Sequence, residues 1–161
     1  MHTLLLSAIT ACAAAQPDLP SDLPTITLTR DDTAITESCL IRIPPGTIIQ
    51  DANNNGVIHI ETDNVTISFH EGDDPAVPLS LTGSEINDNW DTFTGIGVRV
   101  RNASNVTLRN LRIRGYKVAV LATNTPGLTV EHADLSDNYR QRLRSTPLRE
   151  DASDWLYPHD N

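Results

Sequence analysis

A repeat of 22 residues is the feature of this sequence that most constrains its fold. Residues 97–113, shifted by 22 positions, fall on residues 119–135 without a gap. Six apolar positions superpose under this shift: Val98 on Val120, Val100 on Ala122, Val106 on Leu128, Leu108 on Val130, Leu111 on Ala133 and Ile113 on Leu135. A repeat of constant length indicates one structural unit that stacks on the next.

The repeat has the pattern of short strands joined by turns. An earlier copy runs from Ile58 and Ile60 to Val65 and Ile67, with a turn one residue shorter. Apolar residues alternate with polar ones in each copy, as in strands that bury one face, and no stretch shows a helical period over three turns. The turns, each rich in Asn, Asp, Gly or Pro, are residues 61–64, 101–105 and 123–127. We therefore predict an all-β stack of parallel strands. The alternative, a β-sandwich, has no reason to repeat at constant length.

Three Asn-x-Ser/Thr triplets begin at Asn64, Asn102 and Asn105. Each asparagine falls in one of these turns and is followed by the first residues of a strand. We interpret them as turn residues and assign no glycan.

The segments GVIHIETDNVTISF, GVRVRNASNVTLRNLRIRGY and GLTVEHADLSDN resemble the repeats of right-handed parallel β-helix proteins, the pectin-lyase-like group. The resemblance covers about residues 34–138 and is specific for fold rather than chemistry. It implies a right-handed parallel β-helix of about four or five coils. No catalytic motif of the group can be matched residue by residue, so the resemblance assigns no catalytic residue.

The chain divides into four predicted parts. We expect a signal segment in residues 1–15, an N-terminal cap and first strands in 16–50, coils in 51–138 with an insertion at 72–95, and a polar loop or truncated next coil in 139–161. Relatives of this fold are usually longer, and solenoids need capping units. We interpret the chain as an N-terminal portion of a larger protein. The alternative is that residues 139–161 fold back as the cap.

Residues 1–15, MHTLLLSAITACAAA, have the form of an export signal that closes on small residues, although no Lys or Arg precedes the apolar run. Residues 9–12, ITAC, also resemble a bacterial lipobox, which would make Cys12 a lipid anchor. No segment approaches the ~18 continuous apolar residues of a transmembrane helix. We expect a secreted, periplasmic or cell-envelope protein. After cleavage Cys39 would have no partner, and we predict that it is a small core residue.

The charge is unevenly distributed along the chain. A net charge of −9 argues against a nucleic-acid binder that relies on positive potential. Residues 43–98 contain nine acids and no Lys or Arg. The carboxylates that could bind calcium are Asp73, Asp74, Asp88 and Asp91. Their spacing matches no EF-hand loop, so a solvated acidic surface is the simpler interpretation and no metal site is assigned.

Residues 99–117 have the opposite charge to residues 43–98, because they contain six basic residues and no acid. The 22-residue shift places Arg109 beside Glu131 and Arg112 beside Asp134, which predicts stabilising charge ladders between adjacent coils. The other arginines of this strip, Arg99, Arg101 and Arg114, could face a polyanion, because guanidinium pairs with carboxylates.

Two further segments add candidates. Trp90 in the insertion could stack on a sugar ring, or it could cover the end of the stack together with Phe93. Arg140 and Arg142 follow the last repeat. The predicted substrate-binding set is Arg99, Arg101, Arg114, Trp90, Arg140 and Arg142.

These features predict an exported β-helix protein that binds or processes polysaccharide, with an acidic polymer as one candidate and lyase-, epimerase- or hydrolase-type chemistry. The competing hypothesis is a non-catalytic structural or adhesive solenoid of the cell envelope. A third resemblance, to periplasmic β-helix proteins of copper-enzyme maturation, would rest on the scattered histidines His59, His70, His132 and His159.

Overall fold

The computed structural model describes residues 23–70, 79–87, 89–141 and 144–149. This part of the chain is all-β apart from one 3-10 turn, η1 (Trp90–Thr92). The strands are β1 (Thr25–Thr27), β2 (Thr33–Ile35), β3 (Cys39–Arg42), β4 (Ile58–Ile60), β5 (Thr66–Phe69), β6 (Leu81–Thr82), β7 (Ile96–Arg101), β8 (Thr107–Arg109), β9 (Ile113–Arg114), β10 (Val118–Thr123) and β11 (Thr129–Glu131).

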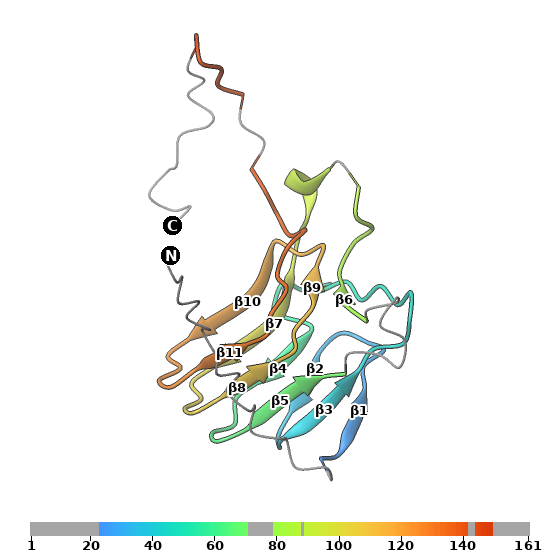
Figure 1. Ribbon diagram of the computed structural model, residues 1–161, viewed down its shortest axis with the longest axis vertical. Helices are drawn as coiled ribbons and strands as arrows, with labels where there is room; N and C mark the ends of the chain where they lie inside the picture. Colours follow the sequence, from blue (N-terminus) through green and yellow to red (C-terminus); the bar gives the residue numbers. More distant parts are fainter. Residues whose placement is uncertain (1–22, 71–78, 88, 142–143, 150–161) are drawn as a thin grey trace, which may run out of the picture.

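The strands form three sheets, and every strand pair within them is parallel. Sheet I has the order β1-β3-β5-β8-β11, sheet II the order β10-β7-β4-β2, and sheet III consists of β6 and β9. In Figure 1 the two larger sheets fan out in the same sense, from β10 and β11 at one end to β2 and β1 at the other.

The chain visits these sheets in a constant order. It passes through sheet II, sheet I and sheet III as β4, β5 and β6, and repeats the sequence as β7, β8 and β9. It then enters sheet II as β10 and sheet I as β11, and an isolated parallel bridge pairs Asp134 with Arg112 beside sheet III. This cyclic order is compatible with a parallel β-solenoid. We call one passage of the chain through sheets II, I and III a coil.

The predicted 22-residue register is confirmed. Val120 pairs with Val98 and Ala122 with Val100 in sheet II, and Val130 pairs with Leu108 in sheet I. The earlier copy is in register as well, because Ile58 and Ile60 pair with Val98 and Val100. Parallel strands need the same side-chain alternation on both partners to keep one face buried, which is why the apolar pattern fixed the pairing.

The core lies between the sheets and is made of the inward members of this alternation. Ile41, Ile60, Leu108 and Ile113 are fully or almost fully buried. Cys39 is a buried free thiol in the same cluster, as predicted. Burial, with a smaller contribution from the charge of Glu37, raises the pKa of the Cys39 thiol to about 11. The thiol is therefore protonated at neutral pH.

The turn asparagines stack on one another between coils. Asn64, Asn102, Asn105 and Asn124 all have φ between 50° and 57°, a region that asparagine tolerates better than most residues. The Asn105 side-chain amide donates to the Asn64 side-chain oxygen at 3.0 Å, and Asn124 donates to Asn102 at the same distance. These contacts confirm that the residues of the three triplets act as turn residues.

Burial departs from the repeat pattern in the last coil. Ala122, Val130 and Leu135 occupy inward positions of the pattern, yet Ala122 is exposed and the exposed fractions of Val130 and Leu135 are 43% and 39%. Within the described residues, β10 and β11 are the outermost strands of their sheets and pair on one side only. The inward face of this coil is consequently half covered.

Several predictions concern residues outside the described part of the chain, including the signal segment at 1–15 and the lipid anchor at Cys12. Residues 72–78 and 88 of the insertion, and residues 142–143 and 150–161 of the last segment, also lie outside it. Among the residues that the structure describes, no helix has the length and apolar character needed to cross a membrane.

Candidate functional site

The outer face of sheet III carries a set of hydroxyl and charged side chains. Leu81 and Ile113 pair with each other and point into the core, so the residues on either side of them face outward. Thr82 is the register partner of Arg114, and Ile48 forms a parallel bridge with Thr82. Three successive coils thus place Ile48, Thr82 and Arg114 in one row.

A cavity of about 270 Å³ lies along this row; we call it the Arg114 pocket. Its lining comprises Pro44, Pro45, Gly46, Thr47, Ile48, Leu79, Ser80, Thr82, Ile86 and Arg114. A turn forms one wall: the backbone amide of Thr47 donates to the carbonyl of Pro44 at 3.2 Å, and Gly46 has φ +72°. The adjoining segment is tied to sheet III where the Ile49 amide donates to the Thr82 carbonyl at 2.8 Å.

The lining of the Arg114 pocket combines apolar and polar groups. Ile48 and Ile86 are exposed large hydrophobic residues. The hydroxyls of Ser80 and Thr82 lie 3.0 Å apart and hydrogen-bond to each other. The guanidinium of Arg114 supplies several donors and a positive charge. An apolar wall beside hydroxyls and one cation suits a ligand that has an apolar face, hydroxyl groups and an anionic group.

Asp134 contributes a negative charge close to Arg112 and Arg114. Its carboxylate accepts hydrogen bonds from the Ser136 hydroxyl and from the Ser136 backbone amide, the latter at 3.1 Å. These bonds lower the pKa of Asp134, and the charges of Arg112 and Arg114 add to the effect. Asp134 therefore stays ionised at neutral pH, and its charge partly offsets those of the two arginines.

The structure separates the predicted arginines between sheets. Arg99 and Arg101 lie on β7 in sheet II, whereas Arg114 lies on β9 in sheet III. Arg101 forms an ion pair with Glu61 of the preceding coil, with a distance of 2.5 Å between Nη2 and Oε1. The predicted Arg109–Glu131 ladder is confirmed at 2.7 Å. The basic strip of the sequence is therefore not one continuous surface.

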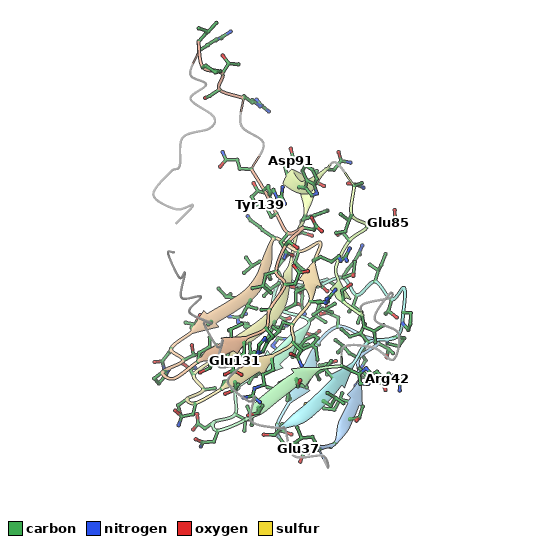
Figure 2. The ribbon with its side chains drawn as sticks, viewed as in Figure 1. Glu37, Arg42, Glu85, Asp91, Glu131 and Tyr139 are labelled. Atoms are coloured by element: carbon green, nitrogen blue, oxygen red, sulfur yellow. The ribbon has the colours of Figure 1, made fainter. Side chains whose placement is uncertain are left out.

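Trp90 and Arg140 are brought together near η1. The guanidinium carbon of Arg140 lies 5.1 Å from the centre of the Trp90 ring, a cation–π geometry, and Arg140 also lies 3.9 Å from Asp137. Phe93, the other aromatic residue of the insertion, is buried. Figure 2 shows Asp91 of η1 and Tyr139 toward this end of the molecule, away from Glu131 on β11. Arg142 lies outside the described residues.

Of the four suggested calcium ligands, Asp73, Asp74 and Asp88 lie outside the described residues. Within the described ranges no three His, Cys, Asp or Glu side chains gather as a metal site would require.

Two features escaped the sequence reasoning. Pro44 and Pro45 form a wall of the Arg114 pocket, which nothing in the sequence indicated. Asp51 is a buried carboxylate that accepts hydrogen bonds from the backbone amides of Asn55 and Gly56 at 3.1 Å and of Ile96 at 2.8 Å. Asp51 thereby joins two coils through a structural role. Its position before an Asn-rich turn was the available signal.

Comparison of the chain with protein-family models, with curated proteins and with solved structures finds no match.

Proposed function

We propose that this protein is an exported right-handed parallel β-helix of the pectin-lyase-like type, which binds an acidic polysaccharide in the Arg114 pocket. The constant order of sheets II, I and III supports the β-helix, and parallel crossovers are right-handed in the great majority of proteins. The apolar run at residues 1–15 supports export.

The Arg114 pocket is the observation that carries the functional part. Arg114 was one of the arginines that the sequence suggested for a polyanion, and its side chain lines a cavity. A uronate unit offers a carboxylate for the guanidinium, hydroxyls for Ser80 and Thr82, and an apolar ring face for Ile48 and the two prolines. Arg pairs with carboxylates in a fork geometry, which gives orientation as well as affinity.

A specific observation also favours the structural or adhesive alternative. Arg101 and Arg109 are both engaged with carboxylates of neighbouring coils, at Glu61 and Glu131. These two arginines therefore link neighbouring coils. A solenoid that only binds polymer would need no further group than the Arg114 pocket provides.

The binding test uses isothermal titration calorimetry of the full chain with an oligogalacturonate and with an uncharged oligosaccharide of equal length. We expect binding of the uronate oligomer alone, and a loss of at least about tenfold in affinity for Arg114→Gln, as for one charge-assisted hydrogen-bonded pair. Arg101→Gln is the matched control, because it removes the same charge from another sheet. Equal binding of both oligomers, or equal loss in both variants, contradicts the proposal.

A second assay separates processing from binding. Uronate lyases release unsaturated products that absorb in the ultraviolet, so a panel of acidic polysaccharides is followed by absorbance with and without calcium. An increase in absorbance that Arg114→Gln reduces supports lyase chemistry at this pocket. Binding without any increase favours the adhesive function, and chromatography of the incubated polymer then tests for hydrolysis.

A further inference from the structure

A second cavity lies next to the Arg114 pocket, along the same two segments of the chain. It has a volume of about 290 Å³ and is lined by residues 50–52, 54, 83, 84 and 94; we call it the Asp51 pocket. Ile48 and Thr82, which line the Arg114 pocket, are bridge partners. Two residues further along these segments, Gln50 and Ser84 line the Asp51 pocket. Since two residues of an extended chain span roughly 6–7 Å, the cavities are neighbours on one surface.

No side chain of these two segments stands between the pockets. Ile49 and Gly83 lie between the paired positions, and both are buried. A Cβ atom on Gly83 would lie 2.6 Å from Cε1 of Tyr116, so position 83 faces the core and has no room for a side chain. The Tyr116 hydroxyl in turn donates to the Ile49 carbonyl at 2.6 Å. On these segments only backbone separates the two pockets, and one ligand can occupy both.

The Asp51 pocket offers uncharged polar groups to a ligand. Gln50, Asn54 and Thr94 are exposed, and Ser84 is half-buried. Within the described part of the chain, no hydrogen bond engages these four side chains. Amides and hydroxyls both donate and accept hydrogen bonds, as the hydroxyl groups of a sugar do. The pocket therefore suits a ligand that carries several hydroxyl groups.

The charge of Asp51 disfavours an anionic group in this pocket. Three backbone amides hold the carboxylate in the wall, those of Asn55 and Gly56 at 3.1 Å and that of Ile96 at 2.8 Å. Among the described residues that line the pocket there is no Lys, Arg or His. A carboxylate of the ligand would meet a like charge here, with no cationic side chain to offset it. An uncharged sugar unit avoids this repulsion.

We propose that the two pockets form one groove for an acidic polysaccharide in which an uncharged sugar unit adjoins the uronate unit. The uronate carboxylate pairs with Arg114, and the hydroxyls of the uncharged unit hydrogen-bond to Gln50, Ser84 and Thr94. This inference rests on the proposed function and deepens it, because it specifies the order of charged and uncharged units. A uniform polyuronate would satisfy Arg114 but would place its next carboxylate beside Asp51.

The test is an NMR titration of the full ¹⁵N-labelled chain with disaccharides of one shape. These are α-1,4-digalacturonate, its two forms with one carboxylate reduced to an alcohol, and the form with both reduced. One of the singly reduced forms should bind at least about threefold more tightly than digalacturonate, because it removes the repulsion from Asp51. It should shift the signals of Gln50 and Ser84 as well as that of Thr82. The doubly reduced form should bind most weakly.

Variants of the Asp51 pocket separate its contribution from that of Arg114. Gln50→Ala and Ser84→Ala should each weaken binding of the preferred disaccharide at least about threefold, as for one neutral hydrogen bond. Both should leave the affinity for monomeric galacturonate unchanged, since the monomer needs only the Arg114 pocket. Gln141→Ala is the matched control, because it makes the same change at an exposed glutamine that lines neither pocket. Arg114→Gln should weaken binding of both ligands.

Two results would overturn this inference alone. One is digalacturonate binding at least as tightly as both singly reduced forms. The other is unchanged disaccharide affinity in both Gln50→Ala and Ser84→Ala, with thermal unfolding by circular dichroism confirming that the variants are folded. By contrast, a lack of binding by every charged ligand, or no response to Arg114→Gln, contradicts the proposed function and this inference together.

Discussion

The coil of residues 96–114 and the coil of residues 118–135 have the same apolar pattern and the same register but differ in burial. Leu108 is fully buried, whereas its partner Val130 is 43% exposed. Ile113 is 1% exposed and its equivalent Leu135 is 39% exposed. The earlier coil has paired strands on both sides, and the later one on one side within the described residues.

The alternation of apolar and polar residues therefore determines on which face of the strand a side chain lies. The neighbouring coils determine how much of its surface is buried. The hydrophobic contribution is roughly 25 cal/mol per Å² of apolar area buried. A residue covered on both sides therefore contributes much more to the free energy of unfolding than its repeat partner in a half-covered coil.

The largest expected effect comes from truncating the register partners Leu108 and Val130. Leu108→Ala should lower the free energy of unfolding by about 2–5 kcal/mol, because it leaves a cavity in a closed core. Val130→Ala should cost less than about 1 kcal/mol, since that side chain is partly solvated. Denaturant unfolding followed by circular dichroism measures both. Equal losses would contradict the difference in burial between the two coils.

The next effect concerns Tyr116 and the residue 22 positions later, Asn138. The buried Tyr116 hydroxyl donates to the Ile49 carbonyl at 2.6 Å, and burial raises the pKa of the phenol. Tyr116→Phe should cost about 1–3 kcal/mol in unfolding free energy, because it leaves a buried carbonyl unpaired.

Asn138 instead ties the last coil to its neighbour, and its side-chain amide donates to the Ile113 carbonyl at 2.7 Å. This side chain is half-buried. Asn138→Ala should therefore cost less than Tyr116→Phe when both are measured by denaturant unfolding. The reverse order would show that the last coil is the better packed of the two.

A smaller effect is expected from the ion pair that crosses between the two coils. A double-mutant cycle with Arg109→Ala and Glu131→Ala should give a coupling energy of about 0.5–1 kcal/mol, the range for a partly exposed pair. The coupling should fall as salt is added. A coupling of zero at low salt would mean that the ladder stabilises neither coil.

The smallest effect concerns acid sensitivity in the turns. The Ser104 backbone amide and hydroxyl donate to Asp63 Oδ1 at 2.6 and 2.9 Å and lower the pKa of this carboxyl. Because the pKa of Asp63 is lower in the folded state, the ionised carboxylate stabilises the fold at pH values above its unfolded pKa of 3.8. This stabilisation is lost as the pH falls through the folded-state pKa.

Asp63→Asn should therefore reduce the drop in melting temperature between pH 5 and pH 3. Asp134→Asn should do the same in the last coil, since the pKa of Asp134 is lowered in the same direction. Thermal unfolding at the two pH values measures both variants. A larger fall in melting temperature between pH 5 and pH 3 in either variant than in the wild-type chain would contradict the prediction.

The sequence predicted what local alternation and the repeat control. The shift of 22 residues located the Val98–Val120 pair, the Arg109–Glu131 ladder and the turn asparagines, because parallel neighbours follow from register alone. It did not predict the Arg114 pocket, whose wall at Pro44–Ile48 comes from a coil of different length. The contact between His59 Nε2 and Asp32 Oδ1, at 3.3 Å, was not predicted either, because the turn that contains Asp32 matches no repeat of the sequence.

The central claim is the parallel stacking of coils 22 residues apart, and trans-hydrogen-bond NMR couplings test it most directly. We expect a scalar coupling between the amide nitrogen of Thr129 and the carbonyl carbon of Val106, and another between the amide nitrogen of Asp134 and the carbonyl carbon of Leu111, whose hydrogen bonds measure 2.8 and 2.7 Å. Couplings from these amides to carbonyls in any other register, or in an antiparallel partner, would contradict it.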